Sequence, residues 1–166
     1  MAAPPLSLKA SALQWLAQRE HSQAELRRKL LWLAREQTAP DGRSELADAA
    51  GEVDALLAWL IAHRYLSDAR FVESRVNARA ARYGNLRIRQ ELGRHGATLD
   101  TVTAERLRES ELSRARAVWV RKYGGEPAAS AAERARQMRF LAGRGFSADV
   151  VRRVVRGMPD EPDAAA

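Results

Sequence analysis

The stretch REHSQAELRRKL (residues 19–30) predicts the start of an amphipathic helix. Ser22 stands three residues before Glu25, which is the spacing of a capping box, in which a serine side chain bonds to a backbone N–H group at the start of a helix. Leucines then follow at helical intervals and form an apolar stripe. Because the capping serine already has a bonding partner, we interpret it as structural and not as a nucleophile activated by His21.

The composition of the chain favours an all-α fold. Its 166 residues are 46% apolar and 30% charged, which suits one compact domain covering residues 1–166. Alanine, leucine and arginine dominate, whereas valine, isoleucine and threonine, which favour strands, are sparse. No segment has the pattern of a β-strand, and we predict about nine short helices.

Helical periodicity and breaks at glycine and proline place these helices along the chain. The first half of residues 36–54 contains Pro40 and is expected to be a loop. A core-facing helix is expected after it, because an apolar stripe follows at helical spacing. This stripe consists of Val53, Leu56, Leu57, Leu60 and Ile61. The expected helices span residues 12–19, 22–35, 53–66, 68–83, 86–95, 98–112, 113–123, 128–142 and 147–157, with residues 158–166 as a disordered tail.

Local signals mark the ends of the central helices. Ser67 or Asp68 is expected to cap the helix that follows it, and Gly84 is expected to close that helix at a position where glycine is favoured. Asn85 is then expected to cap the next helix, which ends at Gly96.

The tryptophans divide into two groups by their neighbours. Trp15 and Trp59 lie among leucines and are expected to pack in the core. Trp32 lies off the leucine stripe of its helix, so it either contacts a neighbouring repeat or faces a partner.

Two short patterns recur and indicate an internal repeat. LIAHRYLSD (60–68), LGRHGATLD (92–100) and LAGRGFSAD (141–149) each place an aspartate eight residues after a leucine. RYG (82–84) and KYG (122–124) each end one helix shortly before another begins. Such helical units stack on their neighbours and form elongated bodies. We therefore predict three tandem three-helix repeats, at approximately residues 10–66, 67–112 and 113–157.

The positive charge is concentrated in the middle and last thirds of the chain. The formal net charge is +7, and residues 62–94 contain eight arginines and three acids. Residues 114–156 contain eleven basic residues and three acids, whereas residues 36–54 carry a net charge of −5. Two interpretations stay open for any single arginine: a solvated face, or a groove that contacts phosphate or an acidic protein edge.

Several classes of function find no support in the sequence. The chain has no cysteine, which excludes disulfides, thiolate nucleophiles and zinc–thiolate sites. Its three histidines, His21, His63 and His95, lack metal-binding spacing, and no phosphate-binding glycine loop occurs. We therefore predict that the protein is not an enzyme and has neither a metal nor a cofactor. No signal-peptide core and no membrane-spanning apolar stretch is found, so we expect a cytoplasmic protein without membrane contact.

Four motifs together resemble the RecX family of recombination regulators. They are R-x-H-S-x-x-E-L-x-x-K-L at 19–30, Y-L-x-D-x-x-F at 65–71, the set from Arg79 to Gly96, and KYG with FLAGRGF at 122–124 and 140–146. The third set comprises Arg79, Gly84, Arg87, Ile88, Glu91, Leu92 and Gly96. The resemblance covers about residues 10–157. The chain departs from the family pattern at Ser67, where an aspartate is common, and in the acidic insertion before residue 54.

This resemblance implies a negative modulator of the RecA recombinase. Family members consist of three tandem three-helix repeats, curved so that they can lie in the groove of a RecA filament on single-stranded DNA. They inhibit ATP hydrolysis, strand exchange and coprotease activity by hindering filament growth or promoting disassembly, without a catalytic site. The expected partners are the RecA filament and single-stranded DNA, with double-stranded DNA as a further option, and a monomer is the default. The alternative is a stand-alone DNA-binding regulator with helix-turn-helix-like repeats.

Charge density and helical spacing suggest which arginines form the contacting face. Along one helix, Arg75, Arg79 and Arg82 recur in steps of four and three, so they share a side. Arg79 also lies near the apolar stripe, where an arginine either extends its head to water or meets a carboxylate. The predicted contacting face consists of Arg75, Arg79, Arg82, Arg87, Arg89 and Arg94 of the central repeat and Arg136, Arg139 and Arg144 of the last.

Overall fold

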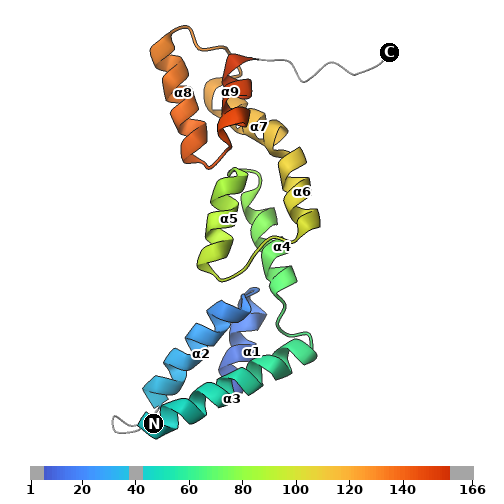
Figure 1. Cartoon of the computed structure of the whole chain (residues 1–166), viewed down its shortest axis with the longest axis vertical. Helices are drawn as coiled ribbons and strands as arrows, with labels where there is room; N and C mark the ends of the chain where they lie inside the picture. Colours follow the sequence, from blue (N-terminus) through green and yellow to red (C-terminus); the bar gives the residue numbers. More distant parts are fainter. Residues whose placement is uncertain (1–5, 38–42, 158–166) are drawn as a thin grey trace. The chain divides into compact units, whose positions relative to one another are not determined.

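The computed structural model describes residues 6–37 and 43–157, and these residues are helical with short turns (Figure 1). Within them the chain forms nine α-helices and no β-strand, which confirms the all-α prediction. The helices are α1 (Leu8–Gln18), α2 (Gln23–Gln37), α3 (Arg43–Ala62), α4 (Asp68–Arg79), α5 (Asn85–Arg94), α6 (Thr101–Glu109), α7 (Glu111–Tyr123), α8 (Ala131–Gly143) and α9 (Ala148–Arg156). The predicted disordered tail, 158–166, lies outside the described residues.

The chain divides into two compact units, and the boundary falls within α4. Unit 1 comprises the residues up to Ser74 together with Gly93–Ala97, and unit 2 comprises Arg75–Leu92 and the residues from Thr98 onward. The repeat boundaries given above and the elongated, curved form stay predictions. None of the helices in the described ranges is long and apolar enough to cross a membrane.

The core of unit 1 is a leucine-rich cluster between α1, α2 and α3. Of the apolar stripe predicted on α3, Val53, Leu57 and Leu60 are buried, as expected. Ile61 is 44% exposed, so the prediction was wrong for this residue. Ile61 lies roughly 80° around the helix from Val53, at the edge of the stripe. The cluster consists of Ala12, Leu26, Leu30, Val53, Leu57, Leu60 and Leu66, with Trp15 and Trp59 packed against it.

Helix α3 begins earlier than the sequence analysis expected. Its first residue is Arg43, ten residues before Val53, whereas a loop was predicted over the first half of 36–54. The residues after Gly42 contain no proline and are rich in alanine, the strongest helix former. From Arg43 onward, helix propensity therefore outweighs the break signal of Pro40 that suggested a loop.

The core of unit 2 lies between α7, α8 and α9. Trp119 is 5% exposed, and its indole N–H donates a hydrogen bond of 2.9 Å to Gln137 Oε1. The single helix predicted over 98–112 instead begins at Thr101 and ends at Glu109, before α7. The buried cluster consists of Ala115, Val118, Trp119, Leu141, Phe146, Val150, Val151, Val154 and Val155.

Two of the three recurring turns meet the start of an earlier helix. After α5, the carbonyl of His95 accepts a hydrogen bond from the Ser22 hydroxyl, just before α2. After α8, the carbonyl of Arg144 accepts a hydrogen bond of 2.9 Å from the N–H of Gly84, just before α5. The third turn, 60–68, follows α3 and leads into α4. It therefore does not recur at the same interval of helices as the turns after α5 and α8.

Gly84 is required for close backbone approach and not for a left-handed conformation. A Cβ atom on Gly84 would lie 2.2 Å from the carbonyl oxygen of Gly145. Gly84 is absent from the residues with positive φ, so the prediction that it ends a helix in the manner of a left-handed glycine was wrong. In the turn after α5, a Cβ on Gly96 would lie 2.6 Å from Ala24 Cβ.

Arg64 ends α3 in a conformation that normally suits glycine. Its φ is 62°, its N–H donates to the carbonyl of Ile61 at 2.9 Å, and the N–H of Tyr65 donates to the carbonyl of Leu60 at 2.9 Å. This bonding pattern usually places glycine at the left-handed position. A side chain there costs free energy because Cβ crowds the following carbonyl.

Replacing Arg64 with glycine is expected to raise the free energy of unfolding by about 1 kcal/mol, because the strain of the left-handed backbone is relieved. Urea titration followed by tryptophan fluorescence measures this change. The matched control is Arg64→Ala, which removes the same charge but keeps Cβ and should leave the stability nearly unchanged. Equal stability of the two variants would contradict the strain argument.

Candidate interaction surface

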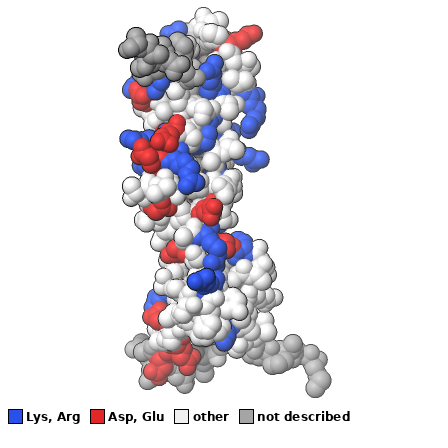
Figure 2. All heavy atoms as spheres, turned by 90° about the vertical axis from the view of Figure 1, so that its right-hand side faces the viewer, with Lys and Arg blue, Asp and Glu red and all other residues white. Residues whose placement is uncertain are grey.

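Eight of the nine arginines predicted to form the contacting face lie in unit 2, and Arg94 lies in unit 1. Arg75, Arg79 and Arg144 are half-buried, whereas the other six are exposed. Figure 2 shows basic side chains spread over the upper part of the viewed face, with acidic side chains among them. The arginines therefore differ in how freely they can meet a partner.

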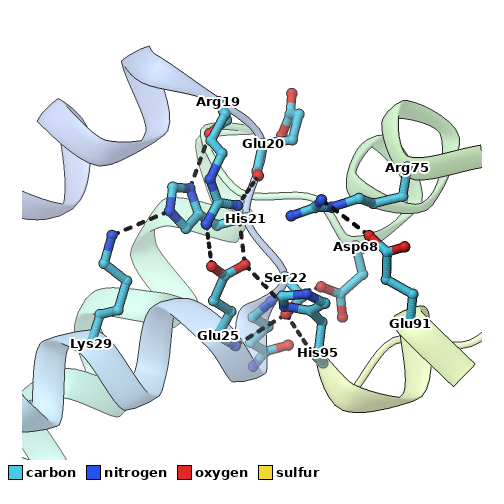
Figure 3. Close-up of polar contacts among 11 residues, drawn as sticks. Arg19, Glu20, His21, Ser22, Glu25, Lys29, Asp68, Arg75, Glu91 and His95 are labelled. Atoms are coloured by element: carbon cyan, nitrogen blue, oxygen red, sulfur yellow. Dashed lines mark hydrogen bonds and ion pairs between the residues drawn. The ribbon is translucent and has the colours of Figure 1, made fainter. Parts of the chain in front are cut away.

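Arg75 and Arg79 share one carboxylate. Arg75 Nη1 lies 3.3 Å from Glu91 Oε1, and Arg79 Nε lies 3.0 Å from Glu91 Oε2 (Figure 3 shows the Arg75 contact). Of the two outcomes considered for Arg79, contact with a carboxylate is the one found. Glu91 thus joins α4 to α5 and neutralises part of the charge of this pair, so these two arginines are less available than their neighbours.

Tyr83 brings three guanidinium groups together. Its ring centroid lies 5.0 Å from Arg87 Cζ and 5.8 Å from both Arg79 Cζ and Arg144 Cζ. Arg144 Cζ also lies 4.8 Å from the ring centroid of Phe140. Such contacts hold an arginine in one orientation, since the ring face attracts the cation.

The contacts continue along α8. The rings of Phe140 and Tyr123 meet edge to face at 5.5 Å, and Arg136 Cζ lies 6.0 Å from the Tyr123 centroid. We call the resulting series the arginine–aromatic row. It consists of Arg87, Tyr83, Arg144, Phe140, Tyr123 and Arg136. The tertiary structure thus joins three of the predicted arginines, from α5, the turn after α8, and α8, into one series.

A half-buried arginine that the sequence analysis did not select, Arg114, holds the chain next to Tyr83 of this row. Arg114 donates hydrogen bonds to the carbonyls of Tyr83, at 2.9 Å, and of Ala80, at 3.2 Å. It also donates to the Leu107 carbonyl and to the side chains of Asn85 and Ser110. Burial lowers the pKa of Arg114, an effect partly offset by the charge of Glu111. This guanidinium therefore serves the fold, because its donors are directed at the chain itself.

Glu111 holds the starts of two helices, α5 and α9. Its Oε1 accepts hydrogen bonds from the N–H of Asn85 at 3.0 Å and of Ser147 at 3.3 Å, and its Oε2 accepts one from the Ser147 hydroxyl at 3.1 Å. The predicted capping role of Asn85 was wrong. Asn85 is buried as the first residue of α5, and its Nδ2 donates to the Leu107 carbonyl at 3.1 Å. No local pattern signals Glu111, because its partners lie 26 and 36 residues away.

The residues of the opening sequence motif form a polar network in unit 1 (Figure 3). The N–H of Glu25 donates to Ser22 Oγ at 3.0 Å, which confirms the capping interaction predicted for the serine. The Glu25 carboxylate instead accepts hydrogen bonds from Arg19, and its Oε2 lies 3.5 Å from His95 Nδ1. His21 is 1% exposed, and its Nδ1 lies 3.0 Å from the Arg19 carbonyl. Ser22 and His21 are thus each engaged in holding the fold.

The two titratable groups of this network have shifted pKa values. Burial lowers the pKa of His21 below its ordinary value of 6.5. Burial raises the pKa of Glu25, but the hydrogen bonds and charge of Arg19, together with the charges of His21 and His95, lower it by more, so it lies below its ordinary value of 4.5. The folded chain therefore favours a neutral His21 and an ionised Glu25.

Other predicted features lie elsewhere on the two units. Trp32 is 62% exposed. Among the residues that the structure describes, no group of three or more histidine, cysteine, aspartate or glutamate side chains could hold a metal ion. Arg121 and Lys122, in the last turn of α7, line a hollow together with Arg82 and Arg144. The sequence analysis did not select these two cations, because the residues that form the hollow with them lie far away along the chain.

Comparisons with known proteins identify related chains. Residues 67–104 match the second three-helix domain of RecX, and residues 109–155 match the third. The chain is 48% identical over 155 residues to the regulatory protein RecX of Ralstonia nicotianae, covering 92% of this chain and 89% of that protein. It is 49% identical over 162 residues to the regulatory protein RecX of Leptothrix cholodnii, covering 96% and 94%. It is 43% identical over 165 residues to that of Herminiimonas arsenicoxydans, covering 98% and 100%.

Glu111→Ala is expected to lower the free energy of unfolding by roughly 2–3 kcal/mol, because the buried N–H of Asn85 and the half-buried donors of Ser147 lose their acceptor. Thermal and urea denaturation measure the loss. Glu109→Ala, at an exposed position two residues earlier, is the control and should change stability little. Similar effects of the two substitutions would show that Glu111 does not have this role.

Acid is expected to destabilise unit 1 in two stages. Below about pH 6.5 the unfolded chain binds a proton at His21 more readily than the folded chain does, and below about pH 4.5 the same holds for Glu25. Glu25→Gln should therefore lower stability at neutral pH by roughly 1–2 kcal/mol and flatten the decline between about pH 5 and 3. Urea midpoints across this range test the effect. An unchanged slope, equal to that of the exposed control Glu73→Gln, would contradict it.

Proposed function

The chain belongs to the RecX family, and on this premise we propose that it is a negative modulator of the RecA recombinase. It binds the RecA filament on DNA and hinders its growth or promotes its disassembly. ATP hydrolysis, strand exchange and coprotease activity of RecA decline as a result. The relatives' shared description as regulatory proteins supports a role that acts on another protein's activity.

The observation that carries this proposal is the arginine–aromatic row of unit 2. Three arginines are oriented there by aromatic rings, and ring contacts leave guanidinium N–H groups able to bind anions. Planar guanidinium groups bind both carboxylates and phosphates in bidentate fashion. A filament of protein on DNA presents both kinds of group, so one basic surface serves for both.

Inhibition of this kind requires occupancy and not chemistry. A protein that covers subunit or DNA surface in a filament blocks addition of the next subunit without forming or breaking a covalent bond. The polar residues of the opening motif are consistent with this view, because each already has a partner within the fold. The Ser22 hydroxyl accepts from the N–H of Glu25, His21 lies against the Arg19 carbonyl, and the Glu25 carboxylate binds the Arg19 side chain.

The contacting face is proposed to consist of the predicted arginines, with different weights. Arg82, Arg87, Arg89, Arg136 and Arg139 are exposed and are the main candidates. Arg75 and Arg79 already contact Glu91 and would contribute less. A stand-alone DNA-binding regulator is less well supported, because the exposed arginines are spread over several helices and do not lie on one recognition helix.

The wild-type protein is expected to inhibit single-stranded-DNA-dependent ATP hydrolysis by RecA at amounts well below those of RecA. The double variant Arg87→Glu, Arg89→Glu should raise the concentration for half inhibition by at least about tenfold, because reversed charges repel both carboxylate and phosphate. Steady-state ATPase titrations measure this.

The matched control reverses two arginines elsewhere in unit 2, Arg106 and Arg134. Arg134 lies roughly 200° around α8 from Arg136 and so points away from the row. Arg106→Glu, Arg134→Glu should retain inhibition. No inhibition by the folded wild-type protein, with tight DNA binding, would overturn the proposal in favour of the stand-alone DNA-binding regulator.

A further inference from the structure

A small hollow in unit 2 is lined by four cations. Its volume is about 120 Å³, and its walls come from α7, α8 and the segment after α4. Among the described residues, no aspartate or glutamate belongs to the lining. We call it the basic hollow; it is lined by Arg82, Arg121, Lys122, Arg144, Val118 and Phe140.

The cations of the basic hollow lack a neutralising carboxylate among the residues that the structure describes. None of the four forms an ion pair with a carboxylate in the described part of the chain. The Cζ atom of Arg144 instead lies 4.8 Å from the ring centroid of Phe140, and its Nη1 donates to the carbonyl of Arg82 at 3.2 Å. Like charges gathered without a counter-charge repel one another, so a bound anion would relieve this repulsion.

The larger hollow of unit 1 differs in its charges. Its volume is about 480 Å³, and Asp68 belongs to its lining. Arg70, also in the lining, already pairs with Glu20 at 2.8 Å. The charges that line the hollow of unit 1 therefore give no reason to expect a bound anion there. Of these two hollows, the basic hollow is the one whose lining favours an anion.

We propose that the basic hollow seats one backbone phosphate of single-stranded DNA. Its volume of about 120 Å³ is several times the roughly 10–15 Å³ that holds one water molecule, so the hollow has room for a phosphate group. Arginine forks and a lysine point charge are the usual ligands of a phosphate. The neighbouring ring of Phe140 suits a nucleic acid, because proteins that bind single strands combine basic grooves with aromatic side chains.

This inference rests on the proposed function only in taking the DNA under the RecA filament as the ligand. Arg121 and Lys122, in the last turn of α7, supply two of the four cations. Neither belongs to the arginine–aromatic row, so they can be changed without altering the residues on which the proposed function depends.

The test measures the binding of a labelled oligothymidylate by fluorescence anisotropy, without RecA and over a range of salt concentrations. Arg121→Gln, Lys122→Gln is expected to weaken binding at least about tenfold and to reduce the dependence of log K on log salt by about 0.7 for each phosphate that the variant no longer neutralises. The control, Arg106→Gln, Arg134→Gln, removes the same charge and should bind nearly as the wild type does.

RecA ATP hydrolysis is measured in parallel with the same variants. Unchanged DNA affinity and salt dependence of the hollow variant, or no binding by the wild-type protein, would overturn the phosphate assignment. Unchanged DNA affinity together with a loss of inhibition would also overturn it and assign the hollow to an acidic surface of RecA, leaving the proposed function intact. If the variant binds DNA more weakly but the wild-type protein does not inhibit RecA, the phosphate assignment would be supported and the proposed function would be contradicted.

Circular dichroism and thermal melting establish that each variant is folded. If the double variant does not fold, the single substitution Lys122→Gln provides the same comparison at an exposed position. It is expected to weaken DNA binding by a smaller factor and to reduce the salt dependence in proportion. Binding equal to that of the wild-type protein would overturn the assignment in that case too.

Discussion

The arrangement of unit 2 depends on one close backbone contact, between Gly84 before α5 and Gly145 after α8. The N–H groups of Gly84 and Leu86 donate to the carbonyls of Arg144 and Gly145, at 2.9 and 3.0 Å. A Cβ on Gly84 would come within 2.2 Å of the Gly145 oxygen, so only glycine permits the contact. Because Tyr83 and Arg144 flank the two glycines, the same contact brings an aromatic ring to a guanidinium group, and the basic surface follows from a constraint on the backbone.

Arginine has two distinct uses in this protein. Arg114 is half-buried, and it donates hydrogen bonds to carbonyls and to a side chain. These bonds hold together α5, α6 and the segment after α4. In unit 1, Arg19 and Arg70 pair with Glu25 and Glu20 and stabilise the fold locally. The cations of the basic hollow have no carboxylate partner among the described residues. A net positive charge therefore says less about binding than the subset of arginines whose donors the fold leaves unused.

Membership of the RecX family gives this division a functional setting. A regulator that acts by occupying a filament needs a surface whose charges are oriented but not neutralised. Aromatic contacts meet that requirement, since a ring orients a guanidinium group without removing its charge. A carboxylate orients an arginine too, as Glu91 does for Arg75 and Arg79, but it also offsets their charge. In the proposed surface, aromatic rings orient the arginines where binding is expected. A carboxylate orients them where α4 is joined to α5.

The sequence by itself determined the all-α fold, most helix positions, the capping by Ser22, the excess of charge and the family, because these depend on composition, on residues a few positions apart or on ordered motifs. It placed the start of α3 too late, where the break signal of Pro40 and helix propensity conflicted. Only the tertiary structure decided that Gly84 permits a close approach, that Glu111 caps α5 in place of Asn85, and that Arg121 and Lys122 share a hollow with Arg82 and Arg144. The physical reason is distance along the chain: these partners are brought together by packing, and no local pattern records them.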